Sequence, residues 1–81
     1  MMHMRDIKVE SMYRVVHAKS EFSHVAPIYV ADGSIVIVDA KSSKADSVYV
    51  FVRLVLGELT TSVWHPDESF PIHPSVLEEI D

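Results

Sequence analysis

The chain has 81 residues, 48% of them hydrophobic, which predicts one folded domain over residues 1–81 with a single core. It contains no cysteine, which excludes disulfides, thiolate metal ligands and cysteine nucleophiles. With no N-terminal signal segment and no membrane-length apolar run, we expect a cytoplasmic protein. The formal net charge of −5 comes from acidic residues after position 65, and basic side chains do not cluster, so nucleic-acid and membrane partners are disfavoured.

Residues 6–18 fit two periodicities. A strand here would place one set of apolar side chains on a common face: Ile7, Val9, Tyr13 and Val15. A helix would align a different set at i, i+3, i+4 and i+7: Val9, Met12, Tyr13 and Val16. The β-branched content favours the strand, and the helix remains open.

Residues 26–39 predict a β-hairpin. Two alternating apolar runs flank Asp32-Gly33, a pair typical of the two-residue type I′ turn. This register pairs Val30 with Ile35 and Tyr29 with Val36. It assigns four side chains to the core face: Ile28, Val30, Ile35 and Ile37. The opposite face is apolar as well.

Residues 48–56 and 59–65 predict a second hairpin, separated from the first by a polar loop over residues 41–46. Gly57-Glu58 fits a type II′ turn between the two strands. The register then places Val52 opposite Val63 and Phe51 opposite Trp64, which predicts a cross-strand aromatic contact.

Residues 66–81 contain three prolines, which argue against a strand. Pro74, at the first helical position after His73, predicts a short helix with Val76, Leu77 and Ile80 against the body. We therefore expect a mainly β (or α+β) fold: a four- to five-stranded antiparallel sheet or small barrel built from hairpins, with a short C-terminal helix. Because both sheet faces are apolar, either closure or a second copy must cover the second face, and we favour a homodimer over a monomeric barrel.

The segment from Trp64 to Pro74 concentrates the residues with functional potential. Its candidate binding residues are Trp64, His65, Asp67, Phe70 and His73. Tryptophan is a preferred interface anchor, and prolines lower the entropy cost of ordering a binding loop. The structural interpretation, which we favour, is a loop in which Trp64 and Phe70 cap the core.

No recognised catalytic or metal-binding motif is present. The histidines lack a known ligand spacing, no serine-nucleophile motif occurs, and both glycines belong to predicted turns instead of a phosphate-binding loop. We predict no catalytic residues, no metal and no cofactor. Two histidines and a carboxylate, His65, Asp67 and His73, would make an acceptable metal site if the segment folded back on itself.

The favoured function is a non-enzymatic, small, acidic protein–protein interaction module: an adaptor, an accessory subunit, or an inhibitor or immunity-type protein. Its expected partner is another protein or a second copy of itself. The alternative is a β module that binds a small ligand or metal through residues 65–73. A third hypothesis is a small enzyme built at a dimer interface, with His65 as the general base.

Overall fold

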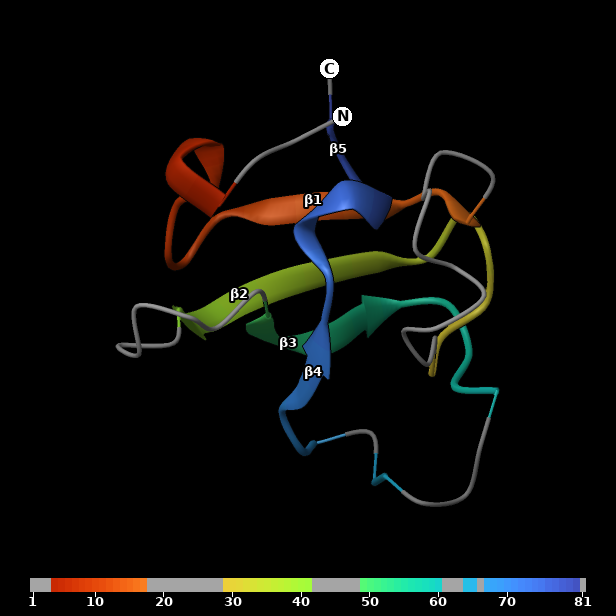
Figure 1. Cartoon of the computed structure of the whole chain (residues 1–81). Coiled ribbons are helices and arrows are strands. Elements are labelled where there is room, and N and C mark those ends of the chain that lie inside the picture. Colours follow the sequence, from red (N-terminus) through yellow and green to blue (C-terminus); the bar gives the residue numbers. More distant parts are fainter. Residues whose placement is uncertain (1–3, 18–28, 42–48, 61–63, 66, 81) are drawn as a thin grey trace.

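Five strands and two short 3-10 turns lie within the described residues. The computed structural model describes residues 4–17, 29–41, 49–60, 64–65 and 67–80. The strands are β1 (Met12–Val15), β2 (Ile35–Lys41), β3 (Val50–Leu56), β4 (Phe70–Ile72) and β5 (Leu77–Glu79), and the turns are η1 (Met4–Asp6) and η3 (Pro74–Val76). Neighbouring strands are antiparallel, in the order β4-β3-β2-β1-β5 (Figure 1). The mainly β prediction is confirmed, and the sheet is open instead of a closed barrel, with β4 and β5 at its edges.

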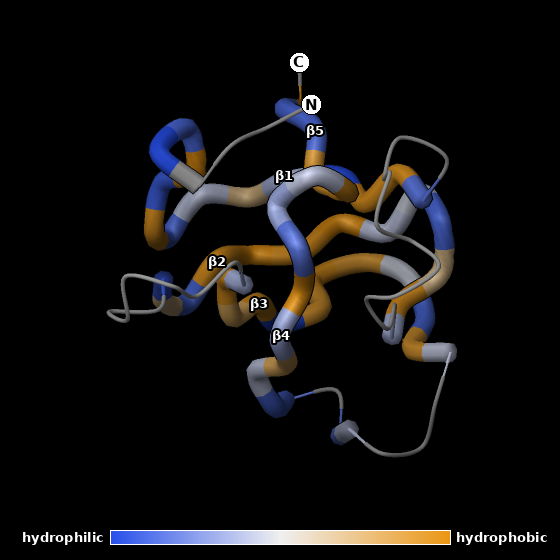
Figure 2. The backbone as a smooth tube through the Cα atoms, in the orientation of Figure 1, coloured by the Kyte–Doolittle hydropathy of each residue, from blue (hydrophilic) through white to orange (hydrophobic). Residues whose placement is uncertain are grey.

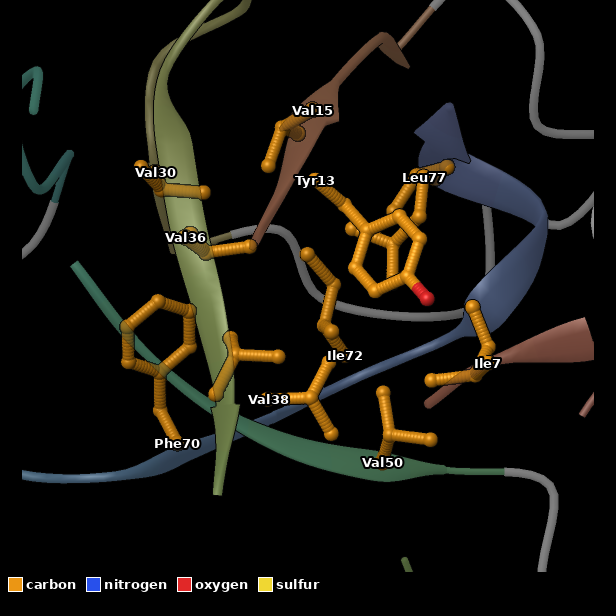
Figure 3. Close-up of a cluster of buried hydrophobic side chains, with 12 residues drawn as sticks. Ile7, Tyr13, Val15, Val30, Val36, Val38, Val50, Phe70, Ile72 and Leu77 are labelled. Atoms are coloured by element: carbon orange, nitrogen blue, oxygen red, sulfur yellow. The ribbon is translucent and has the colours of Figure 1, made fainter. Parts of the chain in front are cut away.

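Alternation along the strands separates an inner face from an outer face. In β3, for example, Val50 and Val52 are fully buried, whereas Phe51 and Arg53 are exposed. The buried apolar side chains form one cluster (Figure 3): Ile7, Tyr13, Val15, Val30, Val36, Val38, Val50, Val52, Phe70, Ile72, Val76 and Leu77. Figure 2 shows that β2 and β3 are hydrophobic along most of their length, so apolar residues also occupy the outer face.

The segment from β4 to β5 crosses the inner face of the sheet (Figure 1). These strands are consecutive in the chain, yet they lie at opposite edges, with β4 paired to β3 and β5 paired to β1. The crossing residues Pro74, Ser75 and Val76 are all buried. This segment therefore covers the core, which the five-stranded sheet would otherwise leave open on its inner face.

The turn at Asp32-Gly33 is confirmed, but the predicted hairpin is wrong. The Ser34 N–H donates to the Ala31 carbonyl at 3.1 Å, and Gly33 has φ +86°. Asp32 does not have a positive φ, so the turn is of the type II kind. Such a turn splays the flanking strands instead of matching their twist, and a hairpin does not continue from it.

The strand partners around this turn come from distant parts of the chain. Val36, predicted opposite Tyr29, instead lies between Tyr13 of β1 and Leu54 of β3. Val30, predicted opposite Ile35, bridges Leu59. The core face of β2 is consequently the one that carries the buried Val36 and Val38, not the predicted one with Ile35 and Ile37, which are only half-buried. Ile28 lies outside the described residues.

The second predicted hairpin is also wrong. Both sides of β3 are already occupied, since Val52 pairs with Val38 on β2 and with Phe70 on β4. Phe51 faces Ala40 and Pro71, not Trp64. After Gly57 the chain runs instead beside residues 29–31, where the Thr60 N–H donates to the Tyr29 carbonyl. Residues 61–63, including the predicted partner Val63, lie outside the described part.

The C-terminal helix is replaced by a 3-10 turn and a strand. Pro74 does begin η3 with His73 as its N-cap, as predicted, but the turn ends at Val76 and Leu77–Glu79 pairs with β1. Ile80 is exposed instead of packed on the body. The prolines did not prevent a strand: β4 contains Pro71, which is tolerated at the sheet edge.

The N-terminal segment follows the strand prediction in part. Met12–Val15 forms β1, with Tyr13 and Val15 buried as expected. Val9 lies in a turn and is 47% exposed, so it does not share their face. Glu10, next to it, has φ +70°, a conformation that breaks the regular alternation. Within the described residues, no helix is long and apolar enough to cross a membrane.

Candidate functional site

The five candidate residues do not form a single site. Phe70 is fully buried on β4, and Trp64 is half-buried against the core. His65 and Asp67 are exposed, and His73 is half-buried at the start of η3. The interpretation of Trp64 and Phe70 as residues that cap the core agrees with this placement.

Three aromatic rings pack together at the β4 edge of the core. The ring of Tyr29 lies edge-on to Trp64 at 5.6 Å and to Phe70 at 6.0 Å, and Trp64 and Phe70 are 6.4 Å apart. Such pairs add stability beyond their buried area. The buried Nε1–H of Trp64 has no hydrogen-bond acceptor in the described part of the chain. Among the described residues it is the one buried side-chain nitrogen or oxygen atom without a hydrogen-bond partner, and burial of such a donor costs free energy.

His73 caps the 3-10 turn η3. Its Nδ1 accepts a hydrogen bond from the Ser75 backbone N–H at 3.1 Å and lies 2.7 Å from the Ser75 hydroxyl. Because Nδ1 is the acceptor, its proton resides on Nε2. The pairing resembles a nucleophile with its base, but Ser75 is 1% exposed and out of reach of a substrate. The ring of Tyr49 packs edge-on against His73 at 6.2 Å.

The described residues contain no group of three His, Cys, Asp or Glu side chains placed to hold a metal ion. His65, Asp67 and His73 all lie in the described part, and the structure does not bring them together. The backfolding that the metal hypothesis requires is therefore not observed.

The most distinctive surface is the outer face of the sheet. We use this name for the apolar residues Met12, Ile35, Ile37, Phe51, Val55 and Leu56, together with the charged residues Arg14, Asp39, Arg53 and Glu78. The register makes them neighbours. Met12 lies opposite Ile37, which lies opposite Arg53; in the adjacent row, Arg14 lies opposite Ile35, which lies opposite Leu56.

Two ion pairs flank the apolar part of the outer face. Arg14 Nη1 contacts Glu78 Oε1 at 3.0 Å, across β1 and β5. Arg53 Nε donates to both oxygens of Asp39, at 2.9 and 2.7 Å. The arginine side chains are 42% and 48% exposed, and both carboxylates are 26% exposed. Each arginine therefore stands further into solvent than its acid.

Asp39 is additionally held by Ser69, whose hydroxyl donates to Oδ2. Burial of the carboxylate favours a raised pKa, but the hydrogen bonds from Ser69 and Arg53 and the charge of Arg53 outweigh it, so the pKa of Asp39 is lowered. Asp39 is the extra residue of a bulge in β2, which is why its side chain reaches this position. The interaction ties the residue before β4 to the neighbouring strands.

A bulge also explains the exposed end of β3. Ile35 faces Leu56 and Val36 faces Leu54, so Val55 is the extra residue, and Val55 and Leu56 both point outward. The apolar surplus is evident in the sequence, but its location on the surface is not. Only the pairing of β1, β2 and β3 brings Met12, Ile37 and Leu56 onto one surface.

Comparisons with models of known protein families, with curated proteins and with solved structures found no match. The function therefore has to be inferred from the residues of this chain.

Proposed function

We propose that the protein is a non-enzymatic protein–protein interaction module that uses the outer face of its sheet to bind another protein chain. The main support for this proposal is the exposure of large apolar side chains on this face. Leu56 is 70% exposed, Met12 and Val55 are each 51% exposed, and Phe51 is 39% exposed. Contiguous apolar surface of this kind on a small domain marks interaction sites.

The composition of the face supports this proposal. Met and Phe are enriched in interface cores, and arginine is favoured at their charged borders. The ion pairs lie beside the apolar residues, as a polar rim does. An adaptor, an accessory subunit and an inhibitor or immunity-type protein would all use such a surface. The cytoplasmic location belongs to the same proposal and rests on the lack of cysteine.

A photo-activated crosslinking residue placed at position 56 tests the proposal in cells. We expect it to form covalent adducts with protein, because Leu56 lies on the outer face and is highly exposed. The matched control is position 9, since Val9 is also an exposed apolar residue but lies in a turn outside the sheet. Adducts at position 9 and none at position 56 would contradict the proposal.

A small-ligand site near residues 64–73 is the second candidate function, because the buried Trp64 Nε1–H lacks an acceptor among the described residues. A ligand oxygen at that atom would change the tryptophan fluorescence and raise the melting temperature. Titration with a panel of small carboxylates, followed by both signals, tests this candidate. An unchanged melting temperature across the panel would count against it.

A further inference from the structure

We infer that the chain seated on the outer face is a second copy of this protein, so that two sheets pack face to face in a homodimer. This inference rests on the proposed function, because it identifies the partner of the same surface. It goes further by naming the occupant and by predicting which charges control the association.

The charges of the outer face are balanced although those of the molecule are not. The face carries two guanidinium groups, Arg14 and Arg53, and two carboxylates, Asp39 and Glu78. Its formal charge is therefore zero, whereas the whole chain carries −5. Two copies that approach through this face meet no net repulsion, while an approach through acidic surface elsewhere is opposed.

The same face also supplies both sides of a polar contact. Arg53 uses Nε for Asp39, and no hydrogen bond from its two Nη groups occurs within the described residues. Arg14 uses one Nη atom for Glu78. The two carboxylate side chains are each 26% exposed, so both acceptor groups reach the surface of this face. A two-fold interface needs donors and acceptors on one self-complementary patch, and this face contains them.

The apolar residues of the face require an apolar cover. Ile35, Ile37 and Leu56 form a band between the two ion pairs, with no polar side chain among them. A second copy offers an equally apolar band flanked by the same charges. It therefore complements both the apolar band and the ion pairs beside it. An acidic or basic partner would match only the arginines or only the carboxylates.

Light scattering of the purified chain over a dilution series tests the inference. We expect a mass of twice the 9.1-kDa chain at high concentration, falling to one chain on dilution. The double variant Met12→Glu/Leu56→Glu should weaken association roughly hundredfold or more, because each copy loses two exposed apolar side chains that the dimer would bury. Val9→Glu, an equally exposed site off the face, should leave it unchanged. A dimer that persists in the double variant would overturn the inference.

A charge variant tests the inference without altering the apolar residues. Arg53→Glu changes the face from neutral to −2, so association should weaken about tenfold at low salt and recover in part at high salt. Lys8→Glu makes the same change in net charge at an exposed residue outside the sheet and should have little effect. Equal effects of both variants would show that net charge, not the face, controls association. Circular dichroism at each step verifies that the variants are folded.

Crosslinking at position 56 separates failure of the inference from failure of the proposed function. Adducts of twice the chain mass support a second copy. Adducts of another mass, from a chain that is monomeric at all concentrations, overturn the homodimer but leave the interaction function standing. A monomer without adducts at position 56 overturns both.

Discussion

The backbone of Gly57 lies directly against the side chain of Ser34. A Cβ on Gly57 would lie 2.2 Å from Ser34 Oγ, and Ser34 is itself buried, with 3% of its surface exposed. Gly57 also has φ +130°, a backbone conformation that residues other than glycine rarely adopt. The end of β3 and the turn before β2 therefore approach so closely that a side chain at position 57 does not fit.

Gly57→Ala is expected to destabilise the protein by about 2–3 kcal/mol, because steric overlap adds to backbone strain. Gly33→Ala is the control: Gly33 has a positive φ but open space around it, so only strain remains, at about 1 kcal/mol. Urea unfolding of both variants measures the difference. Equal losses would show that the contact with Ser34 contributes nothing.

Phe70→Leu should cost about 1–2 kcal/mol of unfolding free energy, since Phe70 is fully buried against Tyr29 and Trp64. Phe51→Leu, the same substitution on the outer face of the neighbouring strand, should change stability by less than about 0.5 kcal/mol under dilute, monomeric conditions. Thermal unfolding at low concentration gives both values. A larger loss for Phe51 than for Phe70 would mean that the faces of the sheet are reversed.

Asp39 should make stability depend on acid pH. Its pKa is lower in the folded state than its ordinary value of 3.8, so its contribution is complete above that unfolded value. The contribution is lost as the pH falls through the lowered folded pKa. Asp39→Asn should therefore be less stable than the parent at neutral pH, and the gap should close below about pH 4.

Urea titrations between pH 2.5 and pH 7, conditions chosen to bracket that range, measure this gap. Asp67→Asn is the matched control, because Asp67 is exposed and makes no ion pair within the described residues. A gap that stays constant with pH would show that Asp39 contributes through packing and not through its charge.

His73→Ala should cost about 1 kcal/mol, because the buried Ser75 loses the acceptor of its backbone N–H. His73→Asn should recover part of this loss, since a side-chain carbonyl oxygen can cap the same turn. His65→Ala, at an exposed histidine of the same segment, should be neutral within about 0.5 kcal/mol. Thermal unfolding ranks the three. An unaffected His73→Ala would refute the capping role.

Local sequence signals identified the turn at Asp32-Gly33 and the strands β1, β2 and β3, but not the partners of these strands. A turn does form at Asp32-Gly33, but it is of type II and not of the predicted type I′. Val36, three residues after Gly33, pairs with Tyr13 and Leu54. No local pattern contains that choice, because Ile35 and Val36 are equally apolar. The faces of β2 are determined only when β1 and β3 lie beside it.

The C-terminal errors have a different physical origin. Leu77–Glu79 lacks a strand signal of its own and becomes a strand because β1 offers it a free edge. Pro71 would break a central strand but is accepted in an edge strand. Within the candidate site, Trp64 and Phe70 lie at the core as the structural interpretation expected. Phe70 is nevertheless on β4 instead of a loop, and Trp64 does not face Phe51. The polar members could not be placed, because nothing in the sequence says which loop residues converge.

The pairing of β1 with β5 also determines when the sheet can be completed during folding. Arg14 and Glu78 are joined by an ion pair across 64 residues of chain. Tyr13 and Val15 therefore have no strand on their second side until residues 77–79 have been synthesised and residues 70–76 have crossed the core. When paired strands are far apart in the sequence, the chain loses conformational entropy before it gains the contacts between them. Domains dominated by such pairing fold in milliseconds to seconds. During synthesis on the ribosome, β1 can therefore complete its pairing only after β5 has been made.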